Sequence, residues 1–588
     1  MANGERLVTG QLDWASGIDS SRPTTIAGPG NPHGLKPNQL AFLVNGTCRG
    51  GGINVRTGWT PRFQGAPWSG LFQGGYIYTP TDDSDPYLVI AIGGHIWKVD
   101  LNTFVATDLS VAFGLFMPVN QPLFHFVQAE QYLVIQAGDY ASGSPTNPLF
   151  WDGNVMVRSR GFIAPGNVNN QIPSAGAMDY YMNRIWYARG RTYIAGDIKG
   201  GIYGILSTTE NPFALNGDGL TVPSNAGNIR MLAHTAELDT QLGQARMLIG
   251  TTKSIYRLNV PVTRDDWSDP SFSDQQPLQT IAQIRYGPVG DRSDVVVNGD
   301  LFYQTLEPGI RSFTYSQRYF QQWGNTPISR NENRVLRFND RSLLRYSSGI
   351  EFSNRLLQTA LPYLTPVGVA HRAILPLDFD LISTLEEKLP PAWEGMYEGL
   401  NFLQLYEGDF GGFQRAFGAV VSKTGDIEIW ELTQDQRFDA GDRRISMVIE
   451  TPSFTWGDPF RLKELDTLEL WVDKILGKVE FEAYYRPDQY PCYFPWHKWQ
   501  ECTAKDCTED IDNPCGLDQY PKQPYCESFK ATMMLPKPVP GCVKQSGRPS
   551  TLGYQFQIKI VVKGWARVRG MLVYANDKGK APYEGIVC

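Results

Sequence analysis

Short apolar runs recur along most of the chain, each leading into a turn with Gly or Asp and then into a second, aromatic-rich run. The clearest example is Leu88–Asp100. Similar text occurs at Leu133–Gly153, Ile185–Asp197, Met247–Asn259, Leu301–Tyr315 and Gly418–Leu432. Because β-branched and aromatic residues on both sides of turn residues are typical of β-hairpins, the pattern predicts a hairpin at each place.

The spacing of these hairpins favours one repeating architecture. The first five follow one another at intervals of about 45 to 60 residues, which is the range of propeller blades. Radial repetition also protects the edges of short strands. We therefore expect an all-β chain in which residues 61–440 form a β-propeller of about six blades. A β-sandwich, or several small sandwiches, is the alternative.

Residues near 329–361 interrupt the strand pattern. Their apolar positions recur at mixed helical spacing, at Val335, Phe338, Leu343, Leu344, Ile350, Leu356 and Leu357. This spacing predicts a small insertion of short helices on or between the blades. The same stretch carries Arg334, Arg337, Arg341 and Arg345. We expect these arginines to be solvated or ion-paired rather than to bind a ligand.

Segments in which apolar and polar residues alternate begin near residue 445 and recur, with one long interruption, up to residue 574. The alternation is clearest in Ile445–Phe454, Leu465–Val472, Lys478–Tyr485, Tyr554–Val562 and Ala566–Tyr574. Alternation of this kind is typical of half-buried antiparallel strands. Residues 441–588 are therefore expected to form a β-sandwich, with a Cys- and Pro-rich loop near 490–545. Residues 1–60 are expected to form an extended arm with the first strands.

The cysteines are concentrated in that loop. Cys48 stands alone near the start, and Cys588 ends the chain. The others are Cys492, Cys502, Cys507, Cys515, Cys526 and Cys542. Zinc sites usually present cysteines in close pairs, and the loop has no Cys-x-x-Cys. Disulfides of unknown pairing are the favoured interpretation, with free thiols and a metal site involving His497 as alternatives.

Charge and hydropathy exclude several classes of protein. The 588 residues include 53 basic and 60 acidic ones, for a net charge of −7. A dedicated nucleic-acid binder usually carries a basic surplus, so DNA affinity is not expected. The first residues contain no apolar core of a secretory signal, and no apolar run is long enough to cross a membrane. We expect a soluble protein made in a cytoplasm, without membrane insertion.

Nothing in the sequence indicates catalysis. The six histidines, His33, His95, His125, His234, His371 and His497, are scattered and lie in no known catalytic motif. The acidic turns at Asp82–Asp85 and Asp265–Asp269 lack the frame of a calcium loop. Nucleophile elbows, Walker loops and zinc-protease motifs do not occur. We therefore expect no enzyme activity, no cofactor and no resident metal.

The opening segment is the most distinctive text in the chain. It contains Ser20–Pro23, Asn31–Ala41 and Arg49–Trp59, the last including the Arg-x-Gly phrase Arg56-Thr57-Gly58. This text resembles the start of the propeller-bearing tail proteins of short-tailed bacteriophages, called stabilisation, tail tubular or nozzle proteins. Ile350–Leu357 and the text from Ile445 to Tyr485 are also similar to phrases in that family. The Cys-rich loop has no counterpart in the pattern.

The resemblance implies a structural virion protein. Nozzle members of the family form a homohexameric ring below the portal and the adaptor, or head-to-tail connector. The ring extends and closes the channel for DNA ejection, and DNA passes through without specific binding. Tail fibres or spikes attach to its sides. The expected location is thus the virion tail, with assembly in the cytoplasm of a bacterial host.

Two other functions stay open at this stage. The first is a receptor-binding, glycan-binding or fibre-anchoring propeller module of a virion, with Trp and Tyr side chains stacking on sugar rings. The second is a polysaccharide-degrading propeller enzyme, since propellers host enzymes as well as scaffolds. Assembly with portal and adaptor, retention of glycan and degradation of glycan distinguish the three functions.

Overall fold

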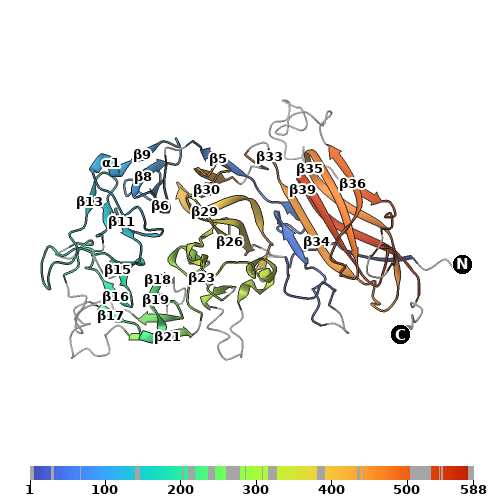
Figure 1. Ribbon diagram of the computed structural model, residues 1–588, viewed down its shortest axis with the longest axis horizontal. Helices are drawn as coiled ribbons and strands as arrows, with labels where there is room; N and C mark the ends of the chain where they lie inside the picture. The colour runs from blue at the N-terminus through green and yellow to red at the C-terminus, as the bar shows by residue number, and fades with distance from the viewer. Residues whose placement is uncertain are drawn as a thin grey trace.

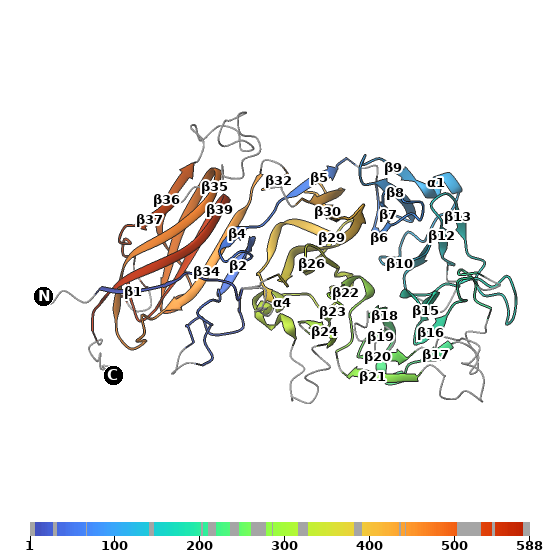
Figure 2. The same ribbon diagram turned by 180° about the vertical axis from the view of Figure 1, so that it is seen from behind.

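The structure is a computed structural model, and it describes residues 6–27, 32–65, 68–139, 146–200, 204–209, 219–235, 246–259, 278–284, 286–307, 309–314, 327–380, 391–433, 437–440, 443–502, 531–541, 543 and 547–579. Nearly all of its regular structure is strand. Figures 1 and 2 show a ring of small sheets beside a second body of long strands. Within the described residues, no helix has the length and apolar character needed to span a membrane.

Five small antiparallel sheets follow one another around the ring, which is coloured blue to green in Figure 1. The first two are β6 (Phe72–Tyr78), β7 (Tyr87–Ile92), β8 (His95–Asp100) and β9 (Ala106–Asp108), then β10 (Phe124–Ala129), β11 (Tyr132–Ala137), β12 (Leu149–Trp151) and β13 (Met156–Arg158). The third and fourth are β14 (Met178–Tyr181), β15 (Arg184–Arg189), β16 (Thr192–Ala195) and β17 (Gly219–Thr221), then β18 (Ile229–Thr235), β19 (Arg246–Thr251), β20 (Ser254–Asn259) and β21 (Leu278–Ile284). The fifth contains β22 (Val295–Val297), β23 (Asp300–Thr305) and β24 (Gly309–Ser312).

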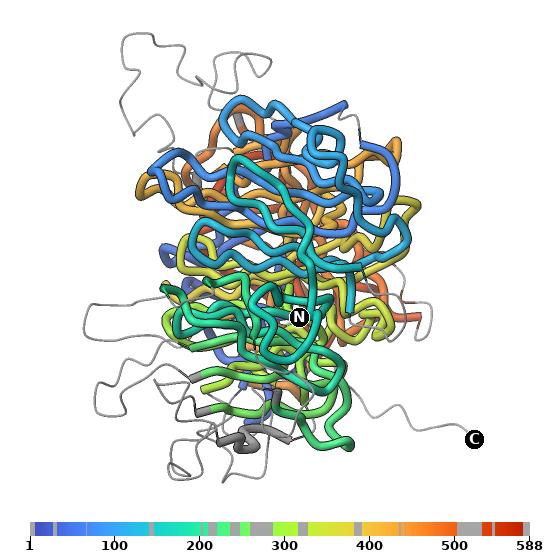
Figure 3. The backbone as a smooth tube through the Cα atoms, turned by 90° about the vertical axis from the view of Figure 1, so that its left-hand side faces the viewer, coloured from blue at the N-terminus to red at the C-terminus, as the bar shows by residue number. Residues whose placement is uncertain are grey.

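An eight-stranded sheet closes the ring. Its strands are β25 (Gly349–Glu351), β26 (Arg355–Thr365), β27 (Gly368–Asp378), β28 (Ala392–Trp393), β29 (Tyr397–Phe410), β30 (Phe413–Val421), β31 (Ile427–Leu432) and β5 (Trp59–Phe63). The first strand of each of the first three blades lies against the first strand of the next, β18 contacts η3 before the fifth blade, and β29 contacts β6. Figure 3 shows the backbone from the outer end of the ring, with the early part of the propeller in blue at the top and the later part in green at the bottom. The propeller is thus confirmed, with five blades and a closing sheet, close to the six expected.

All six predicted hairpins are present, as β7–β8, β11–β12, β15–β16, β19–β20, β23–β24 and β30–β31. The reason is local. Each pair of strands is joined by its own turn, so the pairing needs no residue from elsewhere in the chain. Gly93 and Gly94, in the turn of the clearest hairpin, adopt φ angles of 58° and 81° that suit glycine.

The helical insertion is shorter than predicted. It consists of η4 (Ile328–Glu332), α4 (Asn333–Leu336) and η5 (Leu344–Tyr346), and the chain returns to strand at β25. The prediction of helix for residues 349–361 was wrong. Leu356 and Leu357 point to opposite faces of β26, and each face is buried in a different apolar cluster. With both faces covered, the alternation that marks a strand is hidden. The other short helices among the described residues are α1 (Leu109–Phe113), η1 (Ser224–Ala226) and η3 (Asp291–Ser293).

The second body is a ten-stranded sheet. Its strands are β1 (Arg6–Gln11), β2 (Phe42–Val44), β3 (Gly46–Thr47), β4 (Ile53–Val55), β34 (Ser446–Phe454), β35 (Lys463–Pro487), β36 (Phe494–Cys502), β37 (Ala531–Leu535), β38 (Leu552–Gly553) and β39 (Phe556–Asp577). A separate two-stranded sheet, formed by β32 (Phe438–Asp439) and β33 (Arg443–Arg444), comes directly before β34 in the sequence. Strands β1, β2 and β4 come from the N-terminal segment, which therefore lies within this body.

Two very long strands turn this sheet into a sandwich. β35 has 25 residues and β39 has 22, and each covers two of the strands expected from the sequence. Their register is irregular between Asp473 and Glu480, opposite Gly564, whose φ is 116°. Strands commonly pass from one sheet to another at such bends. Leu470 before the bend and Phe481 after it belong to one apolar core, so the two halves face each other.

Candidate functional site

The innermost strands of the propeller surround an axial cavity of about 630 Å³. Residues of all five blades and of the closing sheet line it. Its charged side chains are Asp179, His234, Asp291, Arg292, Asp294 and Glu407. Its aromatic side chains are Tyr76, Phe124, Phe126 and Tyr406. A concave site with a few convergent polar groups among aromatic ones is a common form of ligand site.

A buried cluster of charges lies beside this cavity. His125 on β10 bonds Asp291 of η3 through Nδ1 and Asp139 through Nε2, the latter at 3.3 Å. Asp139 also pairs with Arg230 and Arg345. Burial disfavours the charged imidazole, but the two carboxylates outweigh it and raise the pKa of His125 to about 9. The cluster thus joins the second, fourth and fifth blades to the helical insertion.

Two carboxylates on the cavity wall have no ion-pair partner among the described residues. Asp294 Oδ1 is buried and has no hydrogen-bond partner among the described residues. Burial, reinforced by the charge of Asp291, raises the pKa of Asp294 well above its usual value. Burial together with the Glu351 charge raises the pKa of Glu407 to about 8. A carboxylate oxygen buried without a counter-ion is costly to ionise, so Asp294 favours its protonated form, whereas the Glu407 side chain keeps contact with solvent.

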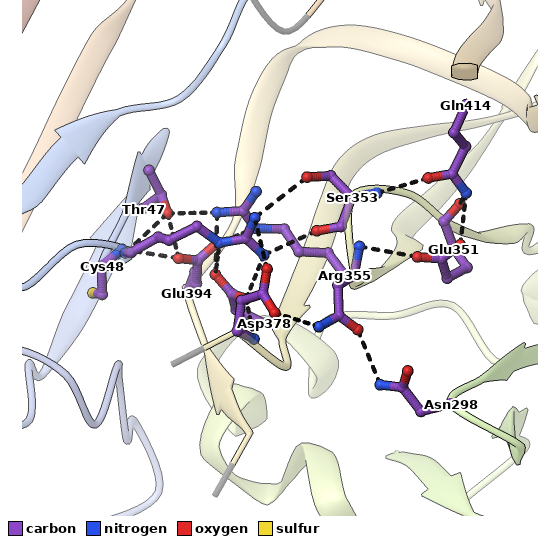
Figure 4. Close-up of polar contacts among 12 residues, drawn as sticks. Thr47, Cys48, Asn298, Glu351, Ser353, Arg355, Asp378, Glu394 and Gln414 are labelled. Carbon is purple, nitrogen blue, oxygen red and sulfur yellow. Dashed lines mark hydrogen bonds and ion pairs between the residues drawn. The ribbon is translucent and has the colours of Figure 1, made fainter. Parts of the chain in front are cut away.

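A second polar cluster joins the N-terminal segment to the closing sheet (Figure 4). Arg49 donates two hydrogen bonds to Asp378, at 2.9 and 2.6 Å. Arg355 pairs with the same carboxylate and with Glu394, both at 3.1 Å. Glu394 also accepts hydrogen bonds from the Thr47 hydroxyl at 2.5 Å and from a backbone N–H at 2.8 Å. Two guanidinium groups thus hold two buried carboxylates, and Arg49 also lies 3.5 Å from the exposed Asp380, so this cluster is a structural joint.

The Arg56-Thr57-Gly58 phrase forms the other half of this joint. Arg56 is 2% exposed and bonds Asp439 through two nitrogens, at 3.0 and 2.9 Å. The same carboxylate accepts the backbone N–H of Trp59 at 3.0 Å. A Cβ at Gly58 would lie 2.1 Å from the Phe438 carbonyl oxygen, so only glycine fits there. The phrase therefore connects β5 of the propeller to the chain that enters the C-terminal sheet.

The structure describes only some of the cysteines that the sequence predicted to form disulfides. Among the described residues, neither Cys492, which is exposed, nor Cys48, which is buried, is bonded to another cysteine. Burial, followed by the nearby carboxylates of Glu394 and Asp378, raises the pKa of Cys48, which makes it a poor nucleophile. The side chain of Cys502 and all of Cys507, Cys515, Cys526 and Cys542 lie outside the described residues. Disulfides among them stay a prediction.

The acidic turn at residues 82–85 is an ordinary surface turn. Asp82 accepts hydrogen bonds from the backbone and hydroxyl of Ser84, at 3.2 and 2.7 Å. Asp85 accepts one from Asn102 at 2.7 Å. In the part of the chain that the structure describes, no group of three or more His, Cys, Asp or Glu side chains is placed to hold a metal ion. The turn at 265–269 lies outside the described residues.

Sequence reasoning missed the axial cavity altogether. Its polar residues come from separate sheets, and no short spacing connects Asp179, Asp294 and Glu407. It also treated His125 and His234 as scattered, whereas each is ion-paired around the ring. His234 lies 3.0 Å from Asp179, which raises its pKa against the effect of burial. The only signal in the sequence was that many of the cavity residues lie on the first strand of a blade, which is the innermost strand of the ring.

Comparison with known proteins adds little to this description. No family model matches the chain, and no curated protein matches it. Among solved structures, one similar chain is from the "Crystal Structure of Mitotic Checkpoint Complex", at 8% identity and a TM-score of 0.32, covering 63% of this chain and 94% of that one. Another is YCF48 from Cyanidioschyzon merolae, at 10% identity and a TM-score of 0.33, covering 64% and 98%.

Proposed function

We propose that this chain is a structural protein of the tail of a short-tailed bacteriophage, namely the nozzle. In this proposal, copies of the chain form a homohexameric ring below the portal and adaptor. The ring extends and closes the channel through which DNA is ejected. The chain contributes mass, stiffness and contact surfaces, and it is not an enzyme.

The observation that carries the proposal is the role of the segment with the family-like text. Residues Arg49–Trp59 include β4, which pairs with the C-terminal sheet, and lead into β5, which pairs with the propeller. Arg49 and Arg56 each form a bidentate pair with a carboxylate in the joint. The distinctive sequence of Arg49–Trp59 is thus explained by a need to hold the propeller and the C-terminal sheet rigidly together. A channel wall needs that rigidity.

The charge of the chain is compatible with such a wall. A net charge of −7 gives no overall surplus of cations for phosphates. Binding to DNA depends on cationic side chains that release condensed counterions. A wall without that surplus lets DNA pass without holding it. Adaptor proteins and tail fibres or spikes are the proposed partners, and the virion tail is the proposed location.

Native mass spectrometry of the purified chain, alone and mixed with the portal–adaptor complex, tests the proposal. We expect a species of six chains, either alone or only on that complex. A monomer or trimer that ignores the complex contradicts the nozzle function. In that event, retention of cell-surface glycan supports the receptor- or glycan-binding module, and its degradation supports the enzyme.

A further inference from the structure

One outer face of the sandwich carries more cations than carboxylates. Strands β34 and β36 form it together with residues 478–487 of β35 and 556–563 of β39. Inward side chains of these strands belong to the apolar core, and the alternate side chains point to this face. Glu501 lies opposite the core residue Val479, so it belongs to the other face. The charged side chains of the outer face, including one from β33, are Glu450, Glu480, Glu482, Arg444, Lys478, Arg486, Lys498, Lys559 and Lys563.

The carboxylates of this face lie beneath its cations. The side chains of Glu450, Glu480 and Glu482 are 9–23% exposed, whereas those of the five cations paired with them are 34–63% exposed. One of these five cations, Arg334, comes from the helical insertion and pairs with Glu450. A molecule that approaches the face therefore meets positive charge first.

Two cations of the face have no carboxylate partner among the described residues. The Lys559 ammonium lies 4.5 and 4.6 Å from the ring centroids of Tyr484 and Tyr493. The Arg486 guanidinium lies 4.6 Å from the centroid of the Tyr493 ring and donates to the Gln557 side chain at 2.7 Å. Aromatic rings attract a cation without cancelling its charge. The face is thus left with positive charge that an anionic surface can contact.

Acidic charge is concentrated in the other body. Residues 61–440, which include the propeller, contain 28 basic and 38 acidic residues, whereas the rest of the chain contains 25 and 22. A closed ring of identical chains needs two different, complementary surfaces on each copy. Figure 1 shows the second blade and the sandwich at opposite ends of the molecule. An acidic surface on the early blades therefore cannot reach the sandwich of its own chain.

Such a surface, here called the acidic corner, lies on the first two blades around Tyr78. It comprises, in the turn between β6 and β7 and in the turn after β12, the exposed or half-exposed Asp82, Asp83, Asp85 and Asp152. Burial, and then the charges of Asp152 and Asp82, raise the pKa of Tyr78 to about 12, so the two turns lie close together. No ion pair involves these four carboxylates in the described part of the chain, and the nearby Lys98 contacts the Tyr87 ring. The corner thus keeps a net negative charge.

We propose that the cationic face of the sandwich docks on the acidic corner of a second copy of this chain. The inference rests on the proposed ring and names the two surfaces that close it. Because the surfaces differ, the contact is heterologous and can repeat from copy to copy around a ring. Opposite charges also steer the copies into one register. Lys559 and the highly exposed Lys498 are the cations expected to meet the carboxylates of the neighbouring copy.

Zero-length cross-linking of the full chain tests this contact. Equal amounts of unlabelled and isotope-labelled chain are concentrated at low salt, or assembled on the portal–adaptor complex, and treated with a carbodiimide. We expect peptides that join Lys498, Lys559 or Lys563 of one copy to the acidic corner of a copy with the other label. Lysines of the face that react only within their own chain, or with another surface of the second copy, overturn the proposal.

Charge reversal measures how far the contact depends on these lysines. Lys498→Glu combined with Lys559→Glu should lower the yield of the mixed-label Lys563 peptides by about tenfold or more, because like charges then face each other across the contact. Lys578→Glu is the matched control, since the Lys578 ammonium lies 2.8 Å from a carboxylate on another part of the sandwich, as that of Lys498 does on this face. An unchanged yield in the double variant, or an equal loss in the control, overturns the proposal.

A charge exchange separates a lost contact from a lost fold. Adding Asp82→Lys and Asp83→Lys to the double variant should restore the yield, because each surface then carries the other's sign. Failure to restore it assigns the loss to misfolding and overturns the proposal. Binding of the unchanged chain to double-stranded DNA, lost on reversal of the two lysines and seen without mixed-label peptides, identifies phosphate as the occupant and also overturns it.

Counting the chains distinguishes this inference from the proposed function. Six chains on the portal–adaptor complex without mixed-label peptides overturn the inference and leave the nozzle function standing. Mixed-label peptides between the two surfaces in an assembly of another size support the contact and contradict the nozzle function.

Discussion

The propeller and the C-terminal sandwich both bury apolar side chains, but the propeller does so between short strands and the sandwich between long ones. Each blade uses strands of three to seven residues, and the apolar side chains between neighbouring blades form separate clusters. The sandwich uses strands of 25 and 22 residues around one continuous core. That core also includes Val295 and Phe302 of the fifth blade. We therefore expect a substitution in the propeller to loosen only the neighbouring blades, and a substitution in the sandwich core to loosen the whole sandwich.

The largest effect should come from breaking the joint between the two bodies. Arg56→Ala leaves Asp439 buried beside Trp59 with only the half-exposed Arg443, 3.4 Å away, as a counter-ion, which we expect to cost about 3–5 kcal/mol. Hydrogen exchange should then rise in β5, β32 and β33 together. Arg62→Ala is the control, because Arg62 is 37% exposed and its pair with Glu431 borders solvent. Equal effects of the two variants would contradict a special role for the Arg56 pair.

A matched pair of core substitutions compares the two bodies directly. Ile135 on β11 and Ile560 on β39 are both fully buried. Truncation of either to Ala should cost about 2–5 kcal/mol. Faster hydrogen exchange should stay within the first two blades for Ile135→Ala, because its cluster contains residues of those blades. For Ile560→Ala it should spread over both halves of the sandwich, and exchange confined to β39 would refute the single core.

A smaller effect should appear in the pH dependence of propeller stability. The usual pKa of histidine is about 6.5, and that of His125 is raised to about 9. His125 therefore stabilises the fold fully below pH 6.5, and this contribution is lost as the pH rises through 9. Burial lowers the pKa of His371 to about 4, so its contribution is present above pH 6.5 and is lost as the pH falls through 4.

Melting temperatures measured from pH 4 to pH 10 check both expected losses of stability, the one at alkaline pH and the one at acid pH. His125→Asn should remove the decline on the alkaline side, which corresponds to no more than about 3 kcal/mol. His371→Gln should remove the decline on the acid side. An unchanged profile in either variant shows that the corresponding histidine does not control stability.

The smallest effect should come from surface ion pairs of the sandwich. Lys537 lies 2.8 Å from Glu464, and the lysine side chain is 49% exposed. We expect Lys537→Ala to change the free energy of unfolding by less than about 1 kcal/mol. Urea unfolding at two salt concentrations measures it. A larger, salt-sensitive loss would mean that surface charge rather than the core holds the sandwich together.

The sequence predicted those parts of the fold that short segments determine alone. The hairpin of Leu88–Asp100 needs only its own apolar runs and the two glycines of its turn. The merger of Leu465–Val472 with Lys478–Tyr485 into one strand depends on pairing with β39, which lies far along the chain. The helix prediction after Gly349 failed because both faces of β26 are covered.

The candidate sites were harder to predict than the fold. The Arg56 phrase was recognisable as text, but its role depends on a carboxylate 383 residues away. The axial cavity is assembled from residues of all five blades and the closing sheet, with no motif inside any one of them. The residues that line this cavity come together only in the folded ring, so the sequence alone does not show that they share a site. The Cys-rich loop was conspicuous in the sequence and lies mostly outside the described residues.

Electron microscopy of virions that carry this chain tests the central claim most directly. The account predicts a sixfold ring below the adaptor, in which each copy fits a propeller joined rigidly to a sandwich and the ring encloses the DNA channel. Density for the chain only at the tip of a fibre, or no density for it in the channel wall, would contradict the account.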